Sequence, residues 1–115
     1  MPGIELREAL DPAGRSPFVR WFARLDAPAA ARVTTALYRL ADGNVSKVKS
    51  VGAGISELRI DFGPGLRVYF GRVGSQLVIL LGGGSKTGQA ADIERAKALW
   101  AWHRRSRRER RDEER

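Results

Sequence analysis

The chain has 115 residues, and 21 lysines and arginines against 13 acidic residues give it a formal net charge of +8. This length suits one domain with its own hydrophobic core, and the absence of cysteine excludes disulfides, thiolate nucleophiles and cysteine-based metal sites. A small domain this basic most often binds nucleic acid or an acidic protein.

A possible edge strand and a helical hairpin are predicted first along the chain. Residues 4–8 have the character of a short strand. Ser16 followed by Pro17 is typical of a helix start, and apolar residues then recur at helical spacing. Asp26 is predicted to cap a second amphipathic helix, which Gly43 ends.

Strands are predicted after these helices. Apolar and polar residues alternate strictly over residues 57–62 and again over residues 66–70, which indicates a hairpin with one apolar and one polar face. Residues 77–81 are an apolar run typical of a central strand buried on both sides, although a short buried helix has the same pattern. Glycines 82–84 are expected to end this strand, and a third helix is expected to begin near Thr87.

These elements predict an α+β fold, in which a helical hairpin and a C-terminal helix lie on one side of a small twisted antiparallel sheet of three or four strands. We expect a single domain over residues 1–102. Residues 103–115 hold seven arginines against four acidic residues, and are expected to be a basic helix end or a disordered tail. No segment is apolar enough to span a membrane and the N-terminus resembles no signal peptide, so a cytoplasmic location is expected.

The polar face of the hairpin is the candidate active surface. If the helices cover the apolar face, the opposite face presents four polar side chains together: Glu57, Arg59, Arg67 and Tyr69. An extended segment over residues 45–51 would place Lys47 and Lys49 on one common face. A purely structural interpretation stays open, because these residues could be solvated charges or cross-strand ion pairs with Asp61 as a further partner.

RNA cleavage by the 2′-hydroxyl is the chemistry that these residues suit. Arginine forks match phosphate oxygens and stabilise the negative charge that the phosphate gains. Lys47, Lys49 or Glu57 could take the hydroxyl proton. His103 is the sole histidine, which excludes a ribonuclease with a histidine acid and a histidine base. The sequence has no metal-binding motif, so neither a metal nor a cofactor is expected.

Residues 82–87 read GGGSKT but do not form a Walker loop. The Walker pattern requires glycine immediately before the lysine and six residues before it, where this chain has Ser85 and Leu80. A helix N-terminus behind a glycine loop can still attract a phosphate. Lys86 is therefore a candidate RNA contact.

An ordered run of short motifs carries a family resemblance. The run comprises Lys49-Ser-Val-Gly52, Gly54-Ile-Ser-Glu57-Leu-Arg59-Ile, Gly63-Pro-Gly65-Leu-Arg67-Val-Tyr69-Phe70 and Leu80-Leu-Gly-Gly83, then Lys86, Gln89, Asp92-Ile93 and Ala96, with Phe18, Trp21 and Leu25 in the first helix. Over roughly residues 4–102 the chain resembles the HigB-like addiction-module killer proteins of the RelE/ParE toxin superfamily.

The resemblance implies the toxin of a type II toxin-antitoxin system, which cleaves mRNA at the ribosome as a metal-independent endoribonuclease and inhibits translation. It also implies a cognate antitoxin, commonly a helix-turn-helix protein, as a partner besides mRNA and the ribosome. The expected catalytic residues are Lys47, Lys49, Glu57, Arg59 and Arg67, of which Lys47 is added from its spacing. The expected RNA-binding residues are Lys86, Tyr69 and Gln89.

Two alternatives stay open at this point. The same fold occurs in toxins that block gyrase and perform no RNA chemistry, and the chain could also be an inactive module that binds an antitoxin or nucleic acid. Some superfamily members use a tyrosine or histidine near the last helix, and residues 86–93 contain neither. The general acid is therefore unassigned.

Overall fold

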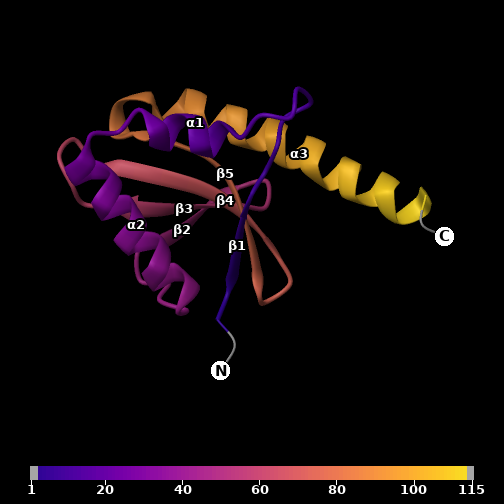
Figure 1. Cartoon of the computed structure of the whole chain (residues 1–115), viewed down its shortest axis with the longest axis horizontal. Coiled ribbons are helices and arrows are strands. Elements are labelled where there is room, and N and C mark those ends of the chain that lie inside the picture. Colours follow the sequence, from indigo (N-terminus) through magenta and orange to yellow (C-terminus); the bar gives the residue numbers. More distant parts are fainter. Residues whose placement is uncertain (1–2, 114–115) are drawn as a thin grey trace.

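The computed structural model describes residues 3–113 and has an α+β fold, as predicted (Figure 1). In chain order the elements are β1 Glu5–Glu8, α1 Pro17–Ala23, α2 Ala27–Ala41, β2 Val48–Gly52, β3 Ile55–Ile60, β4 Leu66–Val73, β5 Leu77–Ser85, a short 3₁₀ helix Lys86–Gly88, and α3 Gln89–Glu113. None of the helices in this part of the chain is long and apolar enough to cross a membrane.

The strands form one five-stranded sheet in the order β1-β5-β4-β3-β2. The expected edge strand is confirmed as β1, but it pairs parallel with β5, with Leu6 opposite Val78. All other neighbours pair antiparallel. The expected run of antiparallel strands is confirmed by the four strands β2–β5, but the sheet is not wholly antiparallel, because β1 adds a fifth, parallel strand at its edge. The intervening helices and strands supply the long connection that parallel pairing requires.

Both predicted helix caps of the hairpin are confirmed. The Ser16 hydroxyl accepts a hydrogen bond from the Val19 amide at 3.0 Å, and the Asp26 carboxylate accepts one from the Ala29 amide at 2.9 Å. Each cap satisfies an amide that the first helical turn leaves unpaired, and contributes about 1 kcal/mol. Gly43 follows the end of α2 with a φ of +92°, a conformation that residues with a side chain rarely adopt.

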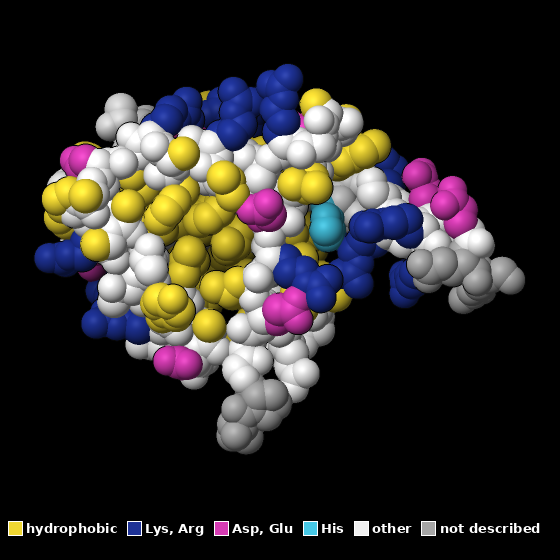
Figure 2. Space-filling view, in the orientation of Figure 1, with side chains coloured by type: hydrophobic (Ala, Val, Ile, Leu, Met, Phe, Trp, Pro, Cys, Tyr) yellow, Lys and Arg dark blue, Asp and Glu magenta, His cyan; other side chains and the backbone are white. Residues whose placement is uncertain are grey.

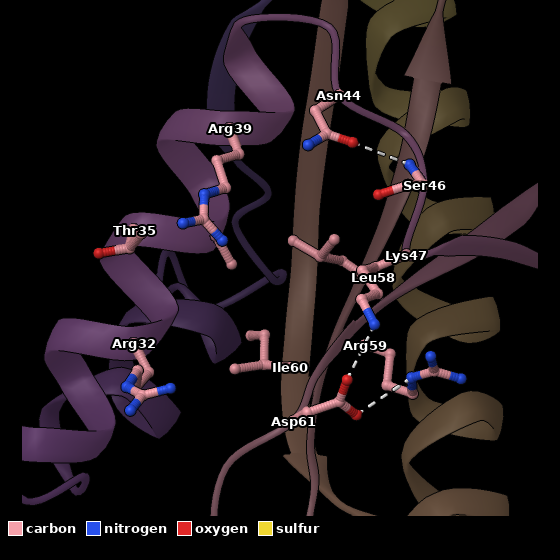
Figure 3. Close-up of a pocket in the computed structure, with 11 residues that line it drawn as sticks. Arg32, Thr35, Arg39, Asn44, Ser46, Lys47, Leu58, Arg59, Ile60 and Asp61 are labelled. Atoms are coloured by element: carbon pink, nitrogen blue, oxygen red, sulfur yellow. Dashed lines mark hydrogen bonds and ion pairs between the residues drawn. The ribbon is translucent and has the colours of Figure 1, made fainter.

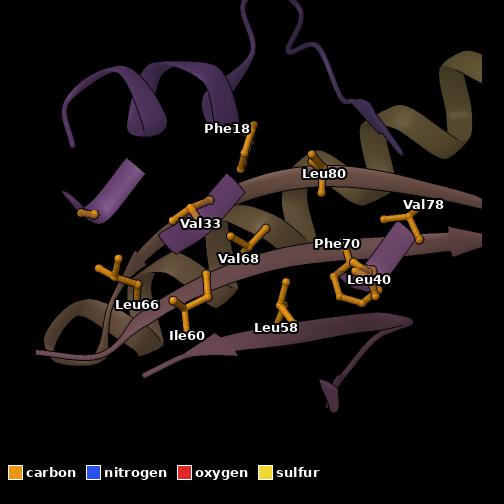
Figure 4. Close-up of a cluster of buried hydrophobic side chains, with 11 residues drawn as sticks. Phe18, Val33, Leu40, Leu58, Ile60, Leu66, Val68, Phe70, Val78 and Leu80 are labelled. Carbon is orange, nitrogen blue, oxygen red and sulfur yellow. The ribbon is translucent and has the colours of Figure 1, made fainter. Parts of the chain in front are cut away.

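Helices cover both faces of the sheet, not one face as predicted. α1 and α2 pack on the face that presents Leu58 and Val68, and Val33 of α2 lies at the centre of this cluster (Figure 4). α3 packs on the opposite face through Leu99 and Trp100. Both faces need cover because consecutive residues of β4 and β5 are apolar and buried. Each of these strands therefore presents hydrophobic side chains on both faces of the sheet.

β5 is longer than the sequence indicates. Its apolar residues are buried on both faces, as expected, but the glycines continue the strand to Ser85 instead of ending it. A side chain at Gly83 would overlap the Trp21 ring, and a side chain at Gly84 would overlap the Asp92 carboxylate. These two glycines therefore let α1 and α3 approach the strand from opposite sides.

The second half of α3 projects beyond the sheet (Figure 1). Residues 103–113 continue the helix without interruption, and Trp100 is the last buried residue along it. Residues 114 and 115 of the predicted tail lie outside the described residues. The projecting half therefore presents most of its side chains to solvent.

Candidate nucleic-acid interface

Basic side chains from separate strand ends meet at the turn between β3 and β4. Arg59, Arg67 and Lys86 line a pocket of about 460 Å³, which we call the hairpin pocket. Arg59 lies directly opposite Arg67 in the register of β3 and β4, so both side chains leave the same face. The Lys86 amide donates to the Gly65 carbonyl at 3.0 Å, which fixes the end of β5 beside this turn. Asp61 also lines the pocket.

Arg67 reaches from the hairpin pocket into a buried polar cluster under the start of α3, formed by Glu57, Arg67, Tyr69, Gln89 and Asp92. Arg67 Nε lies 3.4 Å from Glu57 Oε1, and Gln89 Nε2 donates to Glu57 Oε2 at 2.8 Å. Glu57 and Arg67 are 3% and 9% exposed. The predicted open charged face is therefore wrong here, because α3 covers Glu57. Both oxygens of Glu57 have protein partners, one in the ion pair with Arg67 and one in the hydrogen bond from Gln89.

Tyr69 belongs to the same cluster and is fully buried. Its hydroxyl has no hydrogen-bond partner among residues 3–113. Burial, with the negative charges of Glu57 and Asp92, raises the pKa of Tyr69 to about 12. The predicted RNA contact by Tyr69 does not fit this structure, because a base can stack only on an exposed ring. Gln89 is partly buried and donates to Glu57, and its contact with RNA stays a prediction.

The two lysines predicted to take a proton do not line the hairpin pocket. Lys47 lies in a turn before β2, so the expected extended segment over residues 45–51 is wrong in its first part. Its ammonium donates to Asp61 Oδ2 at 3.0 Å, and Arg59 Nε lies 3.3 Å from Asp61 Oδ1. Lys47, and to a lesser degree Arg59, lower the pKa of the Asp61 carboxyl. Lys49 is exposed on the edge strand β2.

A second cavity extends the positive surface beside the hairpin pocket. This cavity, which we call the α2 groove, has a volume of about 410 Å³ and lies between α2 and the sheet (Figure 3). Arg59 and Asp61 line both the α2 groove and the hairpin pocket. Arg32 and Arg39 of α2 line this groove together with Lys47. Neither arginine is among the site residues predicted from the sequence, although their seven-residue spacing places them on one face of a helix.

The hairpin pocket and the α2 groove carry the chemistry of an anion site. Guanidinium groups bind phosphate oxygens in pairs, and an ammonium group adds a point charge. Among residues 3–113 no group of three or more histidine or acidic side chains could hold a metal ion. The positive charge of these two cavities is supplied by arginine and lysine.

Comparison with known proteins identifies a protein of similar sequence. No family model matches the sequence. The chain is 46% identical over 83 residues to an uncharacterized protein of Haemophilus influenzae, and the aligned region covers 71% of this chain and 84% of that protein. The two proteins belong to one family. Identity at this level over most of both chains indicates that they share the fold described above.

Proposed function

We propose that this protein is the toxin of a type II toxin-antitoxin system, a HigB-like member of the RelE/ParE superfamily that cleaves mRNA at the ribosome without a metal ion. The observation that carries the proposal is the hairpin pocket, where Arg59, Arg67 and Lys86 converge. A convergent set of cations suits a phosphate that gains negative charge when the 2′-hydroxyl attacks it. The motif resemblance points to the same three residues.

The three cations would contribute in different ways. Arg67 is buried in an ion pair with Glu57, which accepts a hydrogen bond from Gln89, so the Arg67 charge is positioned before substrate binds. A fixed charge needs no reorganisation during the reaction, and this is the main source of its catalytic effect. Arg59 and Lys86 are exposed and can close on the phosphate from solvent. Glu57 and Gln89 are then positioning residues that act through Arg67.

A hydrophobic surface supports an antitoxin as the protein partner. Figure 2 shows hydrophobic side chains gathered between α1, α2 and β1. Leu6, Phe22 and Leu37 of these elements pack on the core and stay partly exposed. Contiguous exposed apolar surface commonly marks a protein interface. We propose that a segment of the cognate antitoxin, commonly a helix-turn-helix protein in this superfamily, covers this surface.

The proposal is tested with the exposed residues of the hairpin pocket. Arg59→Ala/Lys86→Ala is compared with Arg15→Ala/Arg24→Ala, which removes the same charge from exposed residues outside both cavities. After brief induction in bacteria, mRNA 5′ ends are mapped with and without a block on translation initiation. Cleavage should fall by about 10²–10³-fold in the pocket variant and stay unchanged in the control. In-frame ends that vanish when initiation is blocked would support cleavage at the ribosome.

Arg67→Ala would be a poor test of the same pocket. Removing one partner of a buried ion pair costs about 3–5 kcal/mol of stability, so lost activity could reflect unfolding. Unchanged cleavage by Arg59→Ala/Lys86→Ala would contradict the assigned site. Growth arrest without new mRNA ends would contradict the nuclease and point to a protein target such as gyrase.

A further inference from the structure

A second group of arginines lies at the other end of the strands from the hairpin pocket. Arg72 of β4 and four arginines of α3 line a groove of about 430 Å³, which we call the arginine groove; the α3 residues are Arg104, Arg107, Arg108 and Arg111. Gly54, Val73 and Trp100 complete its lining. It shares no lining residue with the hairpin pocket. The RNA cleavage proposed for the hairpin pocket therefore assigns no role to this groove.

Helical spacing directs the charge of α3 into this groove. Positions 104, 107, 108 and 111 follow the i, i+3, i+4, i+7 pattern, so these side chains form one stripe. Glu109 and Glu113 fall on the opposite side of the helix by the same rule. Figure 2 shows basic and acidic side chains separated on the projecting end of the molecule. The stripe is therefore a surface of one sign.

The acidic side chains among the described residues do not neutralise this surface. Within residues 3–113, none of the five arginines of the groove forms an ion pair. The Arg104 guanidinium lies 6.0 Å from the centre of the Trp100 ring, which gives it a weak cation-π contact. Like charges held around one groove repel one another, and a bound polyanion would relieve this repulsion.

The surroundings of the stripe favour a phosphate backbone over other anionic partners. Residues 103–113 contain no large apolar side chain that could enter a lipid surface. Trp100 is 6% exposed, so the groove offers no platform for base stacking. The available chemistry is that of guanidinium groups, which pair with phosphate oxygens.

We propose that the arginine groove binds the phosphate backbone of RNA, without base preference, at a site separate from the hairpin pocket. The stripe from Arg104 to Arg111 extends about 10 Å along the helix. Along the axis of a DNA double helix each strand carries a phosphate about every 3.4 Å, and the phosphates of a single strand lie farther apart, so a stripe of this length can reach more than one phosphate of a strand. The choice of RNA over DNA rests on the proposed function, whereas the recognition of phosphate rests on the arginine groove alone.

The test measures binding of the full chain to a labelled uridine oligonucleotide by fluorescence anisotropy at increasing KCl concentration. Arg104→Gln/Arg107→Gln/Arg111→Gln is compared with Arg15→Gln/Arg24→Gln/Arg105→Gln, which removes the same charge outside the groove. Each lost contact with a single strand reduces the slope of log affinity against log salt by about 0.7. The groove variant should therefore lose about 2 from this slope and bind at least about tenfold more weakly at low salt. The control should keep the wild-type slope.

Equal slopes and affinities for the groove variant and the control would overturn the proposal. The groove variant should show the same loss with the matching deoxyuridine oligonucleotide, because RNA and DNA carry the same phosphates, and an unchanged DNA affinity would contradict recognition through phosphate. Because the readout is binding, it does not depend on cleavage. A failure of the proposed nuclease would appear in the 5′-end maps, whereas a failure of the arginine groove would appear in the salt slopes.

Discussion

Tyr69 carries a hydroxyl that is buried in the centre of the molecule without a partner among residues 3–113. Burying an unpaired hydroxyl costs about 1–3 kcal/mol. Tyr69→Phe keeps the ring in place and removes this group. We expect the free energy of unfolding at pH 7 to rise by about 1 kcal/mol, as measured by urea denaturation. A loss of stability would show that the hydroxyl has a favourable contact in solution.

The same residue predicts a pH dependence at the alkaline end. Its pKa is raised from 10.0 to about 12 in the folded protein, so the unfolded chain releases the proton first. The ionisation of Tyr69 therefore leaves the free energy of unfolding unchanged below pH 10 and lowers it as the pH rises from 10 toward 12, by about 1.4 kcal/mol per pH unit. The free energy of unfolding should therefore fall less steeply in this window for Tyr69→Phe than for the wild type. Parallel curves would contradict the assignment.

At the scale of elements, α1 and α3 contact neighbouring residues of β5 from opposite sides. Gly83→Ala should clash with Trp21 and Gly84→Ala with Asp92, and each should cost about 1–3 kcal/mol of stability. Asp92→Ala removes the atoms that Gly84→Ala would meet, so it should rescue that variant and leave Gly83→Ala unchanged. A double-mutant cycle by chemical denaturation measures this coupling. Equal effects of Asp92→Ala on both variants would argue against the packing described.

These glycines also show where local patterns stop being informative. The caps at Ser16 and Asp26 are encoded within a few residues, so the helix starts could be predicted. By propensity glycine ends a strand, but here the close approach of two helices requires glycine within one. The parallel pairing of Glu5 with Leu77 joins distant segments, and no local pattern encodes it.

In the candidate site, too, some features could be predicted from the sequence and others could not. Strand alternation placed Arg59 and Arg67 on one face, and the register of β3 and β4 confirms this. The burial of Glu57 and Tyr69 could not be predicted, because it depends on α3 lying over that face. Pattern therefore predicts which side chains share a face, and tertiary packing decides which of them meet solvent.

At the scale of the whole molecule, positive charge gathers at both ends of the central strands. The hairpin pocket lies beside the turn that follows β3, whereas Arg72 of the arginine groove lies near the other end of β4. A polyanion long enough to contact both would cross a molecule whose extents are 48 × 35 × 25 Å. The net charge of +8 also opposes the compact state, because like charges are closer together in the folded protein than in the unfolded chain.

Self-repulsion of this kind predicts that salt stabilises the protein. The distance over which charges interact falls from about 30 Å at 0.01 M salt to about 8 Å at 0.15 M. We therefore expect the Tm to rise by several degrees, on the order of a 1 kcal/mol gain, over this range in a thermal melt. Arg104→Gln/Arg107→Gln/Arg111→Gln lowers the net charge from +8 to +5 and should have a higher Tm at low salt with a weaker salt dependence.

The charge-matched Arg15→Gln/Arg24→Gln/Arg105→Gln separates local from global repulsion. It also reaches +5 from +8, but it removes charges outside the arginine groove. Repulsion between charges falls with distance and screening, so the clustered arginines should dominate it. The groove variant should therefore gain more stability at low salt than this control. Identical melting curves for the two variants would show that net charge alone sets the effect, and that the arginines of the groove repel one another no more than dispersed charges do.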